Sequence, residues 1–206
     1  MYMKPYHKLE CPDLESIQKE ALVWLTERYN LSDQSSLETD LWLKLDTKSF
    51  LKSNPTLITW FRELNLTCRE VAITVINDYK GAGLHIDELP TVSKINIPIL
   101  NYQHVINEWY RVPENLMSTV NPMINRFGSA YHFLGSVDIE KCDLIGSVEL
   151  QKPVVFNSQI PHRVVCKPEA RFPRVVLTCM FFNEPVEYLN LTERYEQGVI
   201  DRGLNT

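Results

Sequence analysis

Long apolar segments are missing from this 206-residue sequence, and so is an excess of positive charge. No stretch approaches the length of a membrane span, and residues 1–8 contain no apolar signal segment, so we expect no membrane partner. Lysine and arginine number 21 against 26 aspartate and glutamate, which gives a formal net charge of −5. Because broad nucleic-acid binding usually requires a basic stripe, a nucleic-acid partner is not expected either.

Paired cysteine motifs are also missing. The sequence contains 5 cysteines, none of them in a CxxC pair, and Cys68, Cys166 and Cys179 lie in or beside apolar segments. This usage is typical of reduced thiols that serve as small hydrophobic side chains, and it argues against a disulfide framework or a cysteine metal site. The sequence therefore predicts a cytoplasmic protein.

The composition that is present, 44% apolar and 23% charged residues, is typical of a globular protein. The length suits a single domain, residues 1–206, with a sizeable core. Residues 1–68 are predicted to be mainly helical, with an amphipathic helix from Pro12 to Asn30 and a second helix from Asn54 to Leu64. A short strand is predicted at residues 41–45, and residues 1–11 are expected to be irregular.

Residues 69–183 differ in composition from the N-terminal part, because short segments rich in β-branched and aromatic residues are separated by turn residues. Strands are predicted at residues 71–76, 84–87, 95–99, 105–110, 148–150, 154–156, 164–165 and 175–182. Several short strands without helices between them indicate a sandwich, jelly roll or barrel. We therefore predict an α+β, mainly β fold with a jelly-roll core over 69–183 and the N-terminal helices packed on one sheet.

Two further segments complete this prediction. Residues 184–206 are expected to form a C-terminal helix, from Pro185 to Tyr195, and a tail. Residues 111–147 are predicted to be an irregular insertion near the functional site, because such loops often carry binding residues.

Two histidines and an aspartate are candidate metal ligands. His85 and Asp87 stand two apart in a predicted strand, so their side chains point to the same face. His162 comes much later, in a turn that follows another apolar strand. Two imidazoles and a carboxylate on one face, with open positions opposite, form the facial triad of non-heme Fe(II) oxygenases. A solvated strand edge would explain the first pair alone, and the later histidine favours the metal site.

Arg174 is the second chemical signal. It opens the apolar segment that ends at Phe182, and no acidic residue is its neighbour there. A buried guanidinium needs a partner, and a carboxylate bound by two hydrogen bonds is the best one. We predict that Arg174 holds the distal carboxylate of a dicarboxylate ligand. The alternative is a strand-edge arginine that faces water or pairs with an acid from elsewhere. Asn96, which shares a strand face with Lys94, is a further candidate for binding a carboxylate.

Together, the HxD pair of His85 and Asp87, the distal His162 and the later Arg174 resemble the 2-oxoglutarate- and Fe(II)-dependent oxygenases of the double-stranded β-helix fold. The resemblance covers about residues 71–182, and the run 94–101 is similar to small bacterial and phage members. It implies that the first three residues bind Fe(II) and that Arg174 pairs with the distal carboxylate of 2-oxoglutarate.

Two details of the family pattern need separate mention. The family often carries a tyrosine before the HxD pair that contacts the co-substrate, and the resemblance implies this role for Tyr79. Many members have a serine two positions after the arginine. That position is Val176 in this sequence, and Thr178 offers the nearest hydroxyl on the same strand face.

The resemblance implies a hydroxylase that uses O₂ and 2-oxoglutarate and acts on an amino-acid residue of a peptide or on a small metabolite. Two alternatives stay open. One is a cupin-type metalloenzyme without 2-oxoglutarate, in which Arg174 would have no assigned task. The other is a jelly-roll binding protein without catalysis.

Overall fold

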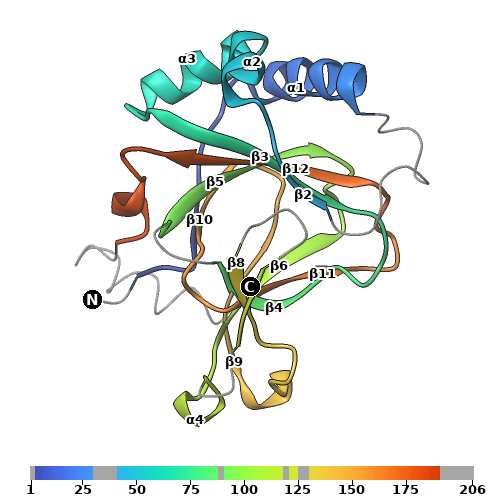
Figure 1. Cartoon of the computed structure of the whole chain (residues 1–206), viewed down its shortest axis with the longest axis vertical. Coiled ribbons are helices and arrows are strands. Elements are labelled where there is room, and N and C mark those ends of the chain that lie inside the picture. The colour runs from blue at the N-terminus through green and yellow to red at the C-terminus, as the bar shows by residue number, and fades with distance from the viewer. Residues whose placement is uncertain (1–2, 30–40, 88–90, 118–120, 125–129, 191–206) are drawn as a thin grey trace.

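The computed structural model describes residues 3–29, 41–87, 91–117, 121–124 and 130–190. The protein is mainly β, with two six-stranded antiparallel sheets and, in this described part, four α-helices. Figure 1 shows α1 (Leu14–Arg28), α2 (Thr47–Lys52) and α3 (Pro55–Glu63) on one side of the first sheet, and the second sheet on its other side. The predicted α+β, mainly β class is confirmed.

The first sheet has the strand order β1-β10-β5-β12-β3-β2. In chain order, its strands are β1 (Tyr6–Lys8), β2 (Leu41–Lys44), β3 (Cys68–Ile76), β5 (Ser93–Leu100), β10 (Val154–Asn157) and β12 (Arg174–Phe181). β12 lies between β5 and β3, and every one of its residues is buried. Burial on both faces explains why β12 is an almost continuous apolar run instead of an alternating one.

The second sheet has the strand order β7-β8-β4-β11-β6-β9. Its strands are β4 (Ala82–Asp87), β6 (Val105–Arg111), β7 (Asn121–Ile124), β8 (Ala130–Phe133), β9 (Asp143–Glu149) and β11 (His162–Cys166). β4 and β11 are the two central strands and pair directly, so the two segments that carry the candidate ligands lie side by side.

The helices begin where the sequence favours them. α1 has Glu15 in its first turn, where a negative charge is stabilised by the helix dipole, and α3 begins with Pro55. The short α2 was not predicted, and its start is capped by Asp46, whose carboxylate accepts the backbone N–H of Ser49 at 3.1 Å. α4 (Glu114–Met117) follows β6. No helix in the described ranges is long and apolar enough to cross a membrane.

The two faces of the first sheet differ in chemistry because successive strand residues point to opposite sides. Ile95, Ile97 and Ile99 of β5 belong to the large core that also contains Ile17 and Leu25 of α1. This packing confirms the prediction that the N-terminal helices cover one sheet. Lys94 and Asn96, which alternate with these isoleucines, face the second sheet. The space between the two sheets therefore receives the polar side chains of β5.

The predicted helices and strands are otherwise confirmed in type, with their ends moved by a few residues. Two irregular segments were wrongly predicted. Residues 111–147 contain α4, β7 and β8, and β8 pairs with β4 beside the candidate ligands. The N-terminal lead contains β1, which pairs with β10. β1 and β8 are short, and each is held by a strand that is distant in sequence. Local sequence patterns do not reveal such pairing.

The predicted C-terminal helix is wrong over its described part. Only a 3₁₀ turn forms, at Val186–Tyr188, and the remainder of the prediction, from residue 191 on, lies outside the described residues. The carbonyl of Leu189 accepts the backbone N–H of Lys4 at 2.7 Å, and Asn190 forms a β-bridge with Met3. Pairing with the N-terminal segment thus uses backbone groups that a continued helix would need.

Ile17→Ala tests the packing of the helical layer. Ile17 has 0% exposure in the core between α1 and the first sheet. We expect the free energy of unfolding to fall by about 3 kcal/mol, because the truncated side chain leaves a cavity. Urea unfolding measures this change. Val23→Ala on the same helix is the control, since Val23 is 54% exposed, and it should change stability by less than about 0.5 kcal/mol. Similar losses in both variants would contradict this packing.

Candidate metal centre

His85, Asp87 and His162 come together on the central strands of the second sheet. One ligand atom from each residue lies within 4.8 Å of the other two. His85 is directly opposite His162 in the antiparallel pairing of β4 with β11, and the centroids of the two rings are 4.2 Å apart. The structure therefore brings all three sequence-predicted ligands to one place.

A glycine determines how closely β4 approaches β11. Gly81 stands just before β4 with a φ of +63°, and a Cβ at this position would lie 2.1 Å from the backbone oxygen of Val164. Any other residue would strain the backbone and push β11 away from β4. The turn before it is closed by Asp78, whose carboxylate accepts the backbone N–H of Lys80 at 2.9 Å. This turn fixes the spacing between the two histidines.

The turn before β11 holds Asp87 from the other side. The backbone oxygen of Ser158 accepts the N–H of Asp87 at 3.1 Å, and the Gln159 side chain donates to the carbonyl of Asp87 at 3.2 Å. Gln159 and Ser158 also donate to the carbonyl of Thr91, at 2.8 Å and 2.7 Å. Both backbone polar groups of Asp87 are thus satisfied, so the direction of its carboxylate is fixed.

Backbone carbonyls orient both imidazoles. Nδ1 of His85 lies 2.7 Å from the carbonyl oxygen of Gly83, and Nδ1 of His162 lies 2.8 Å from that of Ile160. Because a carbonyl only accepts, each Nδ1 carries the hydrogen and each Nε2 keeps its lone pair for a metal. The Nε2 atoms face Asp87, at 3.7 Å from Oδ1 for His85 and 4.0 Å from Oδ2 for His162.

A lysine from the first sheet reaches the same carboxylate. Lys94 of β5 forms an ion pair with Oδ2 of Asp87, and its ammonium lies 5.0 Å from the centroid of the Phe156 ring. Burial would raise the pKa of Asp87, but Lys94 and the two histidines outweigh this effect and hold the pKa of the carboxyl well below its usual range. Asp87 is therefore ionised, as a metal ligand must be.

Burial keeps the two imidazoles neutral. It is the main cause that lowers the pKa of both histidines, and for His162 the pKa falls to about 3. The neighbouring His85 lowers the pKa of His162 further, while Asp87 opposes the shift. A neutral imidazole is the form that binds a metal, so at neutral pH the site has two neutral nitrogen ligands and one anionic oxygen ligand.

Arg174 is a buried cation. Its side chain is 2% exposed, and its Nε atom is buried without a hydrogen-bond partner. Burial lowers the pKa of its guanidinium to about 10, so the group is charged at neutral pH, and among the described residues no ion pair joins it to a carboxylate. A buried charge without a counter-ion is costly. Arg174 therefore marks a place where an anionic ligand would be stabilised.

Asn96 and Thr178 stand between Lys94 and Arg174. They are paired across β5 and β12, both are buried, and the Thr178 hydroxyl donates to Oδ1 of Asn96 at 3.0 Å. Alternate residues of a strand share a face. Lys94 is therefore on the same face as Asn96, two residues before it on β5. Arg174 is on the same face as Thr178, four residues before it on β12, and it lies beyond this pair at the end away from Lys94. We call these four side chains the polar row. Val176, between Thr178 and Arg174, packs in an apolar cluster with Leu150.

Tyr79 is not brought together with the three ligands. Its side chain is 58% exposed, and its hydroxyl donates to the carbonyl of Pro168 at 3.2 Å. Its ring also lies 4.8 Å, edge to face, from the ring of Phe172. These contacts direct Tyr79 to the loop before β12, so the expected role beside the co-substrate has no geometric support.

Two side chains near the ligands had no assigned role in the sequence analysis. Lys94 could have been found from the alternation of β5, where it shares with Asn96 the face opposite the isoleucines. Phe133, opposite His85 on β8, is 40% exposed. A Cβ at Gly135 would lie 2.2 Å from the Phe133 ring, so glycine leaves room for this aromatic side chain. Its position depends on the pairing of β8, which was not predicted.

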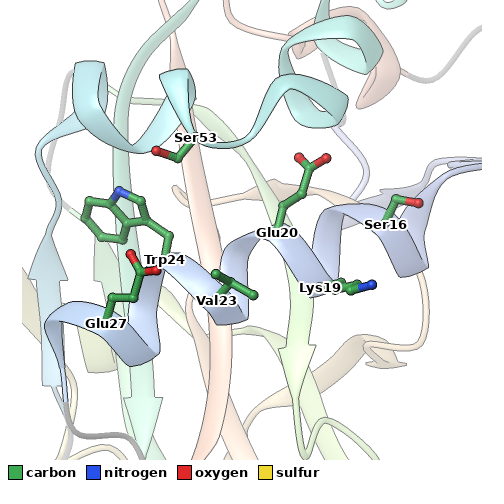
Figure 2. A pocket seen from close by; sticks show the side chains of 7 residues that line it. All are labelled: Ser16, Lys19, Glu20, Val23, Trp24, Glu27 and Ser53. Carbon is green, nitrogen blue, oxygen red and sulfur yellow. The ribbon is translucent and has the colours of Figure 1, made fainter.

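A groove of about 520 Å³ lies on the helical layer. Figure 2 shows its walls, which consist of Ser16, Lys19, Glu20, Val23, Trp24, Glu27 and Ser53. Within the groove, Glu20 is already engaged, because its carboxylate accepts the hydroxyl of Thr56 at 2.6 Å. α1 packs on the face of the first sheet opposite Lys94, so the groove is separate from the metal ligands.

No model of a known protein family matches this chain, and no curated protein matches it. Among solved structures, the chain is similar to AviO1 from Streptomyces viridochromogenes Tue57, at 11% sequence identity and a TM-score of 0.45. The superposition covers 89% of this chain and 92% of AviO1. A likeness at this level carries no argument about function, so the site must be judged from its own residues.

The burial of His162 predicts how stability changes with pH. The folded protein resists protonation of His162 down to about pH 3, whereas the unfolded chain takes up a proton near pH 6.5. Stability should therefore fall from about pH 6.5 to about pH 3, with a slope of up to about 1.4 kcal/mol per pH unit for this group. Asp87 acts in a lower window, because its contribution is lost only as pH falls below about 4.

Urea unfolding of the metal-free protein at several pH values measures this slope. His162→Gln should make it shallower. His132→Gln is the matched control, because His132 is opposite Ile86 in the register and therefore points away from the ligand face. An unchanged slope in His162→Gln would show that His162 titrates normally.

Replacing single ligands should remove metal binding. We expect the metal-free protein to bind Co(II), and His85→Ala or His162→Ala to weaken this binding by about 100-fold or more, because two ligands hold the ion far less tightly than three. The visible absorption of bound Co(II) measures the affinity. His132→Ala should bind Co(II) as the unchanged protein does, and equal binding by all variants would place the metal elsewhere.

Proposed function

We propose that this protein is a 2-oxoglutarate- and Fe(II)-dependent oxygenase that hydroxylates an amino-acid residue or a small metabolite. The observation that carries the proposal is the convergence of His85, Asp87 and His162, with each imidazole turned so that Nε2 faces the carboxylate. Arg174, the buried cation without a carboxylate partner in the described part of the chain, supports the co-substrate.

The donor set suits Fe(II). Two neutral imidazoles and one carboxylate on a single side form the arrangement that non-heme Fe(II) oxygenases use, and it leaves positions open for other ligands. The backbone carbonyls of Gly83 and Ile160 support the imidazoles from behind, as metal-binding histidines require. A structural zinc site would instead surround its ion with four protein ligands, and the described residues supply three.

The polar row suits 2-oxoglutarate. Arg174 would pair with the distal carboxylate, which would satisfy the orphaned Nε and balance the buried charge. Asn96 and Thr178 lie along the strands between Arg174 and the ligand end of the row, where they would meet the body of the co-substrate. Thr178 lies two residues further from Arg174 than the serine of many family members, whose position is taken by Val176.

Each residue would have a distinct task in the reaction. His85, Asp87 and His162 would hold the ion, and Arg174 would orient the co-substrate. The rings of Phe156 and Trp109, packed against each other and close to His162, would keep water away from the reacting atoms. Fe(II) and 2-oxoglutarate, when bound, supply the oxidation in which O₂ is consumed, 2-oxoglutarate becomes succinate and CO₂, and the substrate gains a hydroxyl group.

The arrangement of the sheets is compatible with this proposal. A double-stranded β-helix consists of two facing antiparallel sheets, and its ligands come from well-separated strands. β4 and β11 provide such strands in the second sheet, while β5 and β12 provide the polar row in the first. A cupin-type enzyme without 2-oxoglutarate would leave Arg174 without a task, and a non-catalytic binding protein would leave the metal ligands without one.

Arg174→Ala provides the test of the co-substrate. Anaerobic addition of 2-oxoglutarate to the Fe(II)-loaded protein should produce the weak visible charge-transfer band of the chelate. In Arg174→Ala we expect the affinity for 2-oxoglutarate to fall by about 30-fold or more, because a charge-assisted pair is lost, with Fe(II) affinity nearly unchanged. Arg174→Lys should give an intermediate loss, since an ammonium lacks the planar fork of a guanidinium.

Arg171→Ala is the matched control, because Arg171 is exposed in the loop just before β12. It should leave the band intact. Fe(II) binding without a band in the unchanged protein would favour a metalloenzyme without 2-oxoglutarate. Equal loss of Fe(II) and 2-oxoglutarate binding in Arg174→Ala would make Arg174 a purely structural residue.

A further inference from the structure

Lys94 is a cation that crosses from one sheet to the other. Its strand belongs to the first sheet, and its ammonium pairs with Asp87 of the second. The Lys94 side chain is 13% exposed, and its ammonium is close to the ring of Phe156. An ammonium that is largely withdrawn from water is stabilised by an anionic partner. In the described structure that partner is a residue we assign to the metal.

Metal binding would change this balance. A divalent ion bound to the Asp87 carboxylate would offset its negative charge and repel the ammonium of Lys94. The ion pair between Asp87 and Lys94 would therefore weaken. Fe(II) and dianionic 2-oxoglutarate cancel each other in charge, and the two imidazoles are neutral. Asp87 then supplies one negative charge against two cations, the partly buried Lys94 and the buried Arg174. One positive charge is left unmatched among the described residues of this interior.

The other described acids near these strands are already engaged. Glu184 accepts the backbone N–H groups of Val92 and Ser93, both at 2.8 Å. Glu108 of β6 pairs with Arg163 of β11 at 2.8 Å. These two residues are next in sequence to Trp109 and His162, so their side chains point to the face of the sheet opposite His162. Neither carboxylate is placed to replace Asp87 as the partner of Lys94.

We propose that Lys94 binds a carboxylate of the substrate, so that the substrate is a small carboxylic acid. This inference rests on the proposed function. A single unmatched charge calls for a singly charged anion, which favours a carboxylate over a phosphate. Lysine suits the change of partner, because its ammonium is a point charge on a flexible four-carbon stem. The pair with Asp87 holds Lys94 in place until metal and substrate arrive.

Acetate provides a probe that requires no knowledge of the whole substrate. The protein is loaded with Mn(II), which is paramagnetic, and saturated with 2-oxoglutarate. The relaxation rate of the acetate methyl protons then reports both binding and closeness to the metal. We expect saturable enhancement with acetate and little with acetamide, which has the same shape without the charge. In Lys94→Met the affinity for acetate should fall by about tenfold or more, because a charged hydrogen bond is lost.

Three variants make the comparison specific. Lys94→Arg keeps the charge and should retain acetate binding, whereas Lys94→Gln should lose it and serves if Lys94→Met folds poorly. Lys44→Met is the matched control. Lys44 also belongs to the first sheet and forms an ion pair with Glu70, but its side chain is 61% exposed. Lys44→Met should bind acetate as the unchanged protein does.

The outcomes separate this inference from the proposed function. If 2-oxoglutarate does not bind the Mn(II)-loaded protein, the proposed function fails, and this inference fails with it. If 2-oxoglutarate binds but acetate and acetamide behave alike, or Lys94→Met binds acetate normally, only the substrate carboxylate is overturned. If acetate binds the Mn(II)-loaded protein only when 2-oxoglutarate is left out, Lys94 binds a carboxylate of the co-substrate. That result also overturns the assignment of Lys94 to the substrate.

Discussion

A single carboxylate, that of Asp87, joins the two sheets of this protein electrostatically. It lies in the second sheet, faces both imidazoles and pairs with Lys94 of the first sheet. Displacing Lys94 would leave the charge of this partly buried carboxylate unpaired, because both imidazoles are neutral at neutral pH. The register of β4 with β11, the close approach at Gly81 and the hydrogen bonds from the turn before β11 all serve to keep it in position.

Arg174 poses the opposite problem, because this buried cation has no carboxylate partner in the described part of the chain. A fold optimised for stability alone would replace Arg174 with an apolar residue like those around it on β12. Its retention in a fully buried strand is explained most simply by an anion that enters from outside. Lys94 would pose the same problem if a metal drew on the charge of Asp87, so each end of the polar row carries a cation that a carboxylate would stabilise.

The candidate metal ligands could be proposed from sequence because their signal is local. The spacing of His85 and Asp87 places both on one strand face, and an apolar strand leads to the turn before His162. Lys94 and Phe133 were not assigned because their roles depend on the packing of the sheets and on the pairing of β8 with β4. Tyr79 was assigned from the family resemblance, and its contacts with the loop before β12 direct it elsewhere. Local periodicity thus reveals which face a residue occupies, whereas the partner on that face depends on contacts between distant strands.

The alternation of β5 links these observations. Its isoleucines bind the helical layer, and this apolar packing fixes which face of the strand turns away from the helices. Lys94 and Asn96 then have to face the second sheet, since a slip of one residue would bury the lysine under α1 and expose the isoleucines to the polar interior. The large helix-covered core therefore does more than stabilise the fold. It sets the register that brings the Lys94 ammonium to Asp87, and so it determines the charge beside the three candidate ligands.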